Sequence, residues 1–171
     1  MDQGMGAVAG HLARTANDKN GIEKDSFARS AFNRYYYSAF LEIRDVLKKL
    51  DPSWSKPNHA DVPRLLLDAT IKQIKKEANK SAKAGLLNHS HAQSLITRSN
   101  AAASELAALF DTAREVRRVA DYEPEIPVKT AGNSYSLNEC SLASAAAWKE
   151  RVSTQSKTLL RAYRELGLIS V

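Results

Sequence analysis

The sequence predicts an all-α protein, and three observations lead to this prediction. Apolar residues recur at every third or fourth position through long segments, which is the spacing of one face of a helix. Proline, glycine and asparagine separate those segments, at points where helices end. Through residue 74 no strand pattern interrupts them. We therefore expect an up-and-down bundle of about five helices, forming a single domain over residues 1–171.

The first two expected helices occupy the N-terminal third of the chain. The first is short, covers residues 10–19 and ends in a polar turn. The second begins at Asp25 or Ser26, since either side chain can cap a helix start. It runs to about Leu50 and ends there because Pro52 disfavours helical geometry in the residue before it.

Three further segments are expected to complete the bundle. The third helix starts at Asp61 with Pro63 in its first turn, which suits the fixed backbone of proline. A break over residues 81–91, in which His89 and His91 lie in a loop, separates it from a fourth helix over residues 92–120. A long loop over residues 123–135 follows, and loops of that length are often functional.

The last helix has both of its expected ends marked in the sequence. Ser136 and Glu139 have the spacing of a capping box, in which each side chain bonds a free backbone donor at a helix start. Leu166 is its expected last residue, because Gly167 suits a left-handed stop and Leu168 the apolar contact after it.

The second helix carries the most informative run of residues in the chain. On a helical wheel Tyr35 and Tyr36 fall on the broad apolar band that should face a core. Arg34, Tyr37 and Leu41 fall on the other side. This second face indicates either a cleft that presents Arg34 or a contact surface for another protein.

Basic residues gather at the end of the fourth helix. Arg117 projects near the apolar side, with Arg114 and Arg118 at its margin. An arginine directed at a core needs a partner, and Asp121 at i,i+4 is the nearest candidate. The pair is either a structural ion pair or part of a binding site.

Composition narrows the classes of function. Lys and Arg total 25 against 19 Asp and Glu, a net charge of +6 that permits binding to a polyanion. Five lysines of the third helix form either a phosphate-contacting ridge or a solvated face: Lys72, Lys75, Lys76, Lys80 and Lys83. The single Cys140, read as a small buried residue, makes no internal disulfide. We expect no metal, cofactor, membrane segment or export signal, and a cytoplasmic location.

Three separated motifs resemble the HEPN superfamily of nucleotide-binding helical domains, in particular its small stand-alone prokaryotic members. The first is Ser30-Ala31-Phe32-Asn33-Arg34-Tyr35-Tyr36, similar to the Arg-x-Tyr-Tyr pattern of their second helix. The second is Asn58-His59-Ala60-Asp61, similar to the His-containing start of their third helix. The third is Arg117-Arg118-Val119-Ala120-Asp121-Tyr122, similar to the Arg-rich end of their fourth.

This resemblance implies a homodimer in which two copies of the fourth-helix motif line a positively charged cleft. Many relatives are metal-independent ribonucleases of toxin–antitoxin or other defence systems. Their Arg is followed after four to six residues by His, and that motif is absent here, since Tyr122 stands at the matching place. Tyrosine has an ordinary pKa near 10, so it is a weaker choice than histidine for proton transfer at neutral pH.

The expected site follows from the resemblance together with the residues. Arg117, Arg118, Tyr122 and His59 are the catalytic candidates of a ribonuclease, His59 only if its loop reaches the end of the fourth helix. Substrate-binding candidates are Arg34, Arg114 and Asp121. The expected partners are RNA, such as tRNA, or a nucleotide, and an antitoxin or another subunit of a defence complex. The alternative is a non-catalytic binding module or a structural subunit of such a complex.

Overall fold

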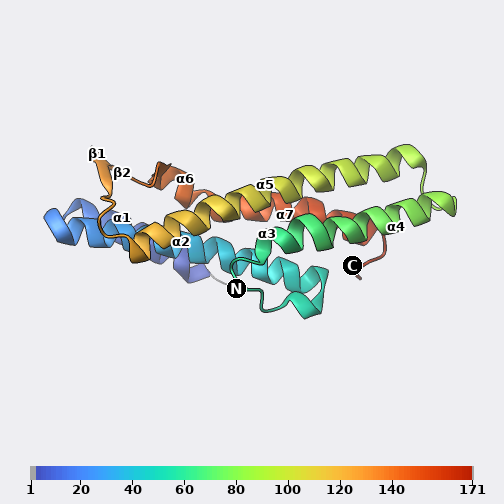
Figure 1. Ribbon diagram of the computed structural model, residues 1–171, viewed down its shortest axis with the longest axis horizontal. Helices are drawn as coiled ribbons and strands as arrows, with labels where there is room; N and C mark the ends of the chain where they lie inside the picture. The colour runs from blue at the N-terminus through green and yellow to red at the C-terminus, as the bar shows by residue number, and fades with distance from the viewer. Residues whose placement is uncertain (1–2, 171) are drawn as a thin grey trace. The chain divides into compact units, whose positions relative to one another are not determined.

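The computed structural model describes residues 3–170, and almost all regular structure within them is helical (Figure 1). This confirms the all-α prediction. The chain forms two compact units. The first unit contains the residues up to Glu42 together with Asp111–Glu150, and the second contains Ile43–Phe110 together with Arg151 onward. In the described part of the chain, no helix is both long and apolar enough to cross a membrane.

Helix α1 (Gln3–Asn17) and the first part of helix α2 (Gly21–Leu50) pack closely in the first unit. The alanines at positions 9, 13 and 16 are buried and give α1 one face of small residues. Helix α1 begins at Gln3, seven residues before the predicted start at Gly10. A side chain added at Gly6 would lie 3.5 Å from Ser38 Oγ. The two backbones approach this closely because their facing residues are small.

Helix α2 begins at Gly21, so the predicted start at Asp25 or Ser26 was wrong. Asp25 does not cap the helix but instead pairs with the guanidinium of Arg29 one turn later and accepts a hydrogen bond from the distant backbone N–H of Val128. The predicted end at Leu50 is confirmed. Asp51 then caps a short 3-10 helix over Pro52–Trp54, and its Oδ1 accepts a hydrogen bond of 2.9 Å from Ser53 N.

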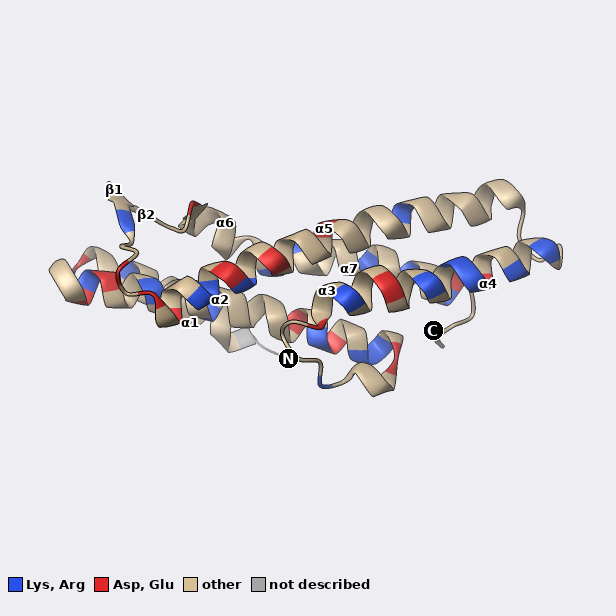
Figure 2. Cartoon of the chain, viewed as in Figure 1, with Lys and Arg blue, Asp and Glu red and all other residues tan. Residues whose placement is uncertain are grey.

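The second unit contains one helical run that changes its winding. Helix α3 (Val62–Arg64) begins as predicted after Asp61, then passes through a π-helical segment η2 (Leu65–Thr70) into helix α4 (Ile71–Lys83). The Thr70 hydroxyl donates to Leu65 O at 2.9 Å, within this wider turn. The five lysines predicted to form a stripe all lie exposed on α4, and Figure 2 shows basic residues recurring along it.

Helix α5 (His89–Tyr122) begins three residues before the predicted Ala92. Asn88 Oδ1 accepts a hydrogen bond of 2.7 Å from His91 N, so Asn88 serves as its cap. The prediction that His89 and His91 lie in a loop was therefore wrong, since both belong to the first turn of α5. Within the second unit, α4 and the first part of α5 run in opposite directions, joined by the turn at residues 84–88 (Figure 1).

The predicted loop over 123–135 and the predicted capping box hold a small antiparallel sheet instead. Its strands are β1 (Lys129–Ala131), β2 (Ser134–Leu137) and β3 (Cys140–Ser141), in the order β1-β2-β3. Ser136 pairs with Ser141, and the intervening Asn138 and Glu139 adopt φ values of 48° and 60°. Two consecutive left-handed residues form a tight hairpin turn, which a helix start cannot accommodate.

Helix α6 (Leu142–Ala146) is capped by Ser141, whose hydroxyl accepts from Ser144 N at 3.1 Å, and helix α7 (Trp148–Glu165) follows it. The single predicted helix is therefore two helices, and α7 ends at Glu165, one residue before the predicted Leu166, whereas the predicted left-handed stop at Gly167 is confirmed. Gly167 has φ of 68°, and Leu168 N donates to Tyr163 O at 2.8 Å, as in a Schellman motif. Cys140 is buried in the first unit, as predicted.

Candidate functional site

Arg117, near the end of α5, is the centre of a cluster of charged and aromatic side chains. Its Nε lies 2.9 Å from Asp121 Oδ2, and both side chains are about three-quarters buried, with exposed fractions of 22% and 25%. The N–H does not point along that line, so the contact is an ion pair without a hydrogen bond. The sequence prediction that Asp121 partners Arg117 is confirmed.

Two tyrosines flank the same guanidinium. Arg117 Nη2 donates to Tyr37 Oη at 3.3 Å, and the guanidinium carbon lies 5.8 Å from the Tyr37 ring centre and 5.6 Å from that of Tyr122. Partial burial lowers the pKa of Arg117, but Tyr37, Asp121 and Tyr122 together raise it. Arg117 therefore carries a permanent charge that its own neighbours largely satisfy.

Asp121 also links α5 to α2. Its Oδ1 accepts a hydrogen bond of 2.6 Å from Asn33 Nδ2, while Oδ2 faces Arg117. One carboxylate thus holds a cation on its own helix and an amide on another. This hydrogen bond fixes the end of α5 against α2, where Arg34 is the residue after Asn33.

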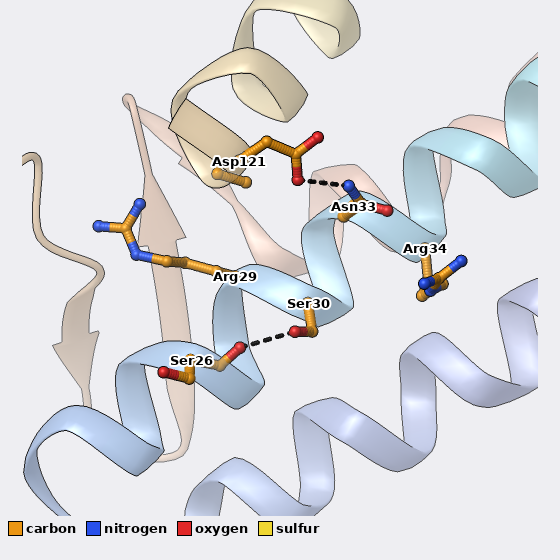
Figure 3. Close-up of a pocket in the computed structure, with 7 residues that line it drawn as sticks. Ser26, Arg29, Ser30, Asn33, Arg34 and Asp121 are labelled. Atoms are coloured by element: carbon orange, nitrogen blue, oxygen red, sulfur yellow. Dashed lines mark hydrogen bonds between the residues drawn. The ribbon is translucent and has the colours of Figure 1, made fainter. Parts of the chain in front are cut away.

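A depression of about 330 Å³ opens beside this link (Figure 3). It is lined by Ser26, Arg29, Ser30, Asn33, Arg34, Ala120 and Asp121. Figure 3 shows Asp121 facing Asn33 from α5, whereas Arg34 turns toward α1. The Arg34 side chain is exposed, and its Nη1 meets the thioether sulfur of Met5 at 3.9 Å, a weak acceptor. Among the described residues, Arg34 therefore keeps most of its N–H donors available. Its exposure agrees with its predicted position away from the core.

Arg29 lines the depression but directs its guanidinium elsewhere. It is 8% exposed and pairs with Asp25. Its terminal nitrogens donate to backbone carbonyls at the end of α5 and in the following loop: Val119 O at 3.1 Å, Glu123 O at 3.2 Å, Pro124 O at 3.3 Å and Ile126 O. Arg29 is thus the residue that holds the 119–126 segment against α2.

Sequence reasoning missed Arg29, although a signal was present. Arg29 precedes the buried Tyr36 by seven residues, close to two helical turns, so both lie on one face. An arginine on an apolar face with an aspartate four residues before it indicates a buried cation with a local partner. Asn33, which contributes the link to Asp121, was also missed and carries no comparable signal.

The other predicted site residues of the first unit have different surroundings. Arg118 pairs with Glu115 at 2.6 Å and with Glu123, and hydrogen bonds to these two carboxylates raise its pKa. Arg114 Nη2 lies 3.8 Å from Asp111 Oδ1, and the Arg114 side chain is about half exposed. Tyr122, the last residue of α5, is 66% exposed, and the Arg117 guanidinium lies over its ring.

Of the tyrosines predicted to face the core, only Tyr36 is fully buried. It stacks on Phe40 with ring centres 6.1 Å apart, and burial raises its pKa. Tyr35 is half-buried beside Gly10, and burial raises its pKa too. Both tyrosines thus keep their protons at neutral pH and serve as packing residues.

His59, the remaining catalytic candidate, belongs to the second unit. It is half-buried in the turn before α3, next to Asn58, whose amide donates to Asp61 Oδ2 at 3.1 Å. Its role in catalysis stays a prediction. Among residues 3–170, no group of three or more His, Cys, Asp or Glu side chains gathers closely enough to hold a metal ion.

Comparison with protein-family models, with curated proteins and with solved structures finds no match to this chain.

Proposed function

We propose that this chain is a cytoplasmic HEPN-like protein of a prokaryotic defence or toxin–antitoxin system that binds RNA at the depression beside Arg34 and Tyr122. The observation that carries the proposal is that the exposed Arg34 lines the depression and the largely exposed Tyr122 directly follows Asp121, another lining residue. Arginine contacts phosphate oxygens through its planar fork, and tyrosine rings stack on unpaired bases. Each nucleotide of single-stranded RNA offers a phosphate and an unpaired base.

The charges around the depression support the same class of ligand. Arg29 is neutralised by Asp25 and by four carbonyls, and Asp121 is shared between Arg117 and Asn33. Arg34 is therefore the cation with the most unused donors in the lining. Ser30, whose hydroxyl donates to Ser26 O at 2.8 Å, keeps acceptor capacity for a ribose hydroxyl.

We further propose that binding occurs without cleavage. The transesterification of RNA needs a group that exchanges protons near neutral pH. Among the catalytic candidates, the neighbours of Arg117 raise its pKa, which leads away from neutrality. The seven lining residues of the depression include no histidine. This favours the alternative of a non-catalytic binding module over an endoribonuclease.

The binding experiment measures the fluorescence anisotropy of a short labelled single-stranded RNA at low and at moderate salt. We expect wild-type binding that weakens with salt, about tenfold weaker binding for Arg34→Ala, and a loss of roughly five- to hundredfold for Tyr122→Ala, since stacking contributes about 1–3 kcal/mol per base. Arg64→Ala is the matched control, because Arg64 is an exposed arginine of the second unit with a loose partner, Asp61 at 3.4 Å. Equal affinities for all four proteins would refute the site.

Cleavage is tested separately with total RNA and with tRNA in EDTA, comparing the wild type with Arg117→Ala. Intact RNA in both samples is the expected result. Cleavage that disappears in Arg117→Ala would overturn the non-catalytic proposal and establish a metal-independent endoribonuclease. Sedimentation velocity of the same samples tests the homodimer that the HEPN resemblance implies, for which we expect a dimer at micromolar concentration.

A further inference from the structure

A second cavity, of about 90 Å³, lies between two helices of the second unit. Helices α5 and α7 line it with three residues each: Leu95, Arg98 and Ser99 from α5, and Thr158, Arg161 and Ala162 from α7. Each triplet has the spacing i, i+3, i+4, which places its members on one face of its helix. The cavity is therefore lined by one stripe of each helix, and each stripe contributes one arginine and one hydroxyl.

The hydroxyl of Ser99 is the unusual feature of this lining. Ser99 is 1% exposed, and its Oγ has no hydrogen-bond partner among the described residues. Buried hydroxyl groups in native proteins are nearly always hydrogen-bonded, because an unpaired one loses its interaction with water without compensation. A partner that enters the cavity can reach this hydroxyl.

The two arginines make the lining rich in donors. Arg161 uses Nε to donate to Glu165 Oε1 at 2.6 Å, which leaves its two terminal nitrogens available. Glu165 is itself shared, since its Oε2 lies 2.9 Å from His91 Nε2. Within residues 3–170 the structure gives Arg98 no ion-pair partner, and its side chain is exposed. The lining thus contains two cations and two hydroxyls, and Glu165, the carboxylate that pairs with Arg161, is not among the lining residues.

We propose that this cavity binds a phosphoryl group, either free inorganic phosphate or the phosphate of a mononucleotide. A tetrahedral oxyanion can accept from both guanidinium groups and from the Ser99 and Thr158 hydroxyls at once, and charge-assisted hydrogen bonds of this kind are strong. The volume holds several water molecules, enough for one phosphoryl group. This site shares no residue with the RNA-binding depression, because all of its residues belong to the second unit and those of the depression to the first.

The experiment titrates the full-length protein with sodium phosphate and, in a separate arm, with adenosine monophosphate, by isothermal calorimetry in chloride buffer. We expect saturable binding with a Kd of about 1 mM or below. Arg98→Gln should weaken it by roughly tenfold, because a hydrogen bond to a charged group is lost, and Ser99→Ala by about fivefold. Tighter binding of the nucleotide identifies a mononucleotide as the ligand, and binding of phosphate alone identifies the free ion.

Ser156→Ala provides the matched control. Ser156 on α7 is also 1% exposed and has no hydrogen-bond partner among the described residues, but it does not line the cavity. Its variant should bind phosphate as the wild type does, and so should Arg64→Ala, whose exposed arginine does not line the cavity. Circular dichroism of each variant verifies folding. No saturation up to about 10 mM phosphate, or equal binding by wild type, Arg98→Gln and Ser99→Ala, would overturn the proposal.

Discussion

Replacing Arg29 by methionine should destabilise the protein far more than replacing an exposed arginine of the same helix. The guanidinium donates to four backbone carbonyls and pairs with Asp25. A hydrogen bond to a charged group contributes about 1.5–3 kcal/mol, but the loop carbonyls regain water when the arginine is removed. Val119 O and Asp25, whose side chain is about one-third exposed, regain less hydration. We therefore expect a loss of about 3 kcal/mol in the free energy of unfolding.

The measurement is urea denaturation followed by circular dichroism. With a slope of about 2 kcal/mol/M, a loss of about 3 kcal/mol lowers the urea midpoint by about 1.5 M. Arg34→Met is the control on the same helix, because Arg34 is exposed and should cost less than about 0.5 kcal/mol. Arg29→Lys should fall between them, since a single ammonium cannot reach the spread of carbonyls. If Arg29→Met costs no more than Arg34→Met, the proposed holding of the 119–126 segment is wrong.

Two further predictions concern the second unit. Burial raises the pKa of Tyr163 to about 12, so its neutral form stabilises the fold fully below pH 10 and this contribution is lost as the pH rises from 10 to 12. The free energy of unfolding should fall over that window in the wild type and fall less in Tyr163→Phe, and parallel curves would contradict this. Gly167→Ala places a side chain at φ of 68° and should lower the stability by about 1–2 kcal/mol, measured as the shift in urea midpoint, whereas an unchanged midpoint would show that the left-handed stop is not required.

The local sequence pattern predicted which segments are helical, but it misplaced several helix ends. Leu50 and Gly167 were predictable because proline and glycine act on their immediate neighbours. The start of α2 was misplaced because Asp25, a good capping residue, bonds to a segment about a hundred positions away. Asp25 could have capped a helix start, but it bonds instead to the backbone N–H of Val128, which only the folded chain brings near it.

The small sheet shows the same limit for longer patterns. Ser136 and Glu139 fit a capping box, yet they lie in a hairpin whose turn places Asn138 and Glu139 in the left-handed region. The strand β2 buries Tyr135 and Leu137 in the first unit, and Tyr135 donates its hydroxyl hydrogen to Asn17 of α1. Burial of these two side chains outweighs the local preference for a helix start.

In the candidate site, the sequence alone determined the Arg117–Asp121 pair and the position of Arg34 away from the core, because both depend only on spacing along one helix. The tertiary structure decided which cations remain available. Carbonyls from a segment distant in the chain occupy the guanidinium of Arg29, and the nearby Glu115 and Glu123 occupy that of Arg118. Charge is a property of the residue, whereas its neutralisation depends on neighbours that only the folded chain supplies.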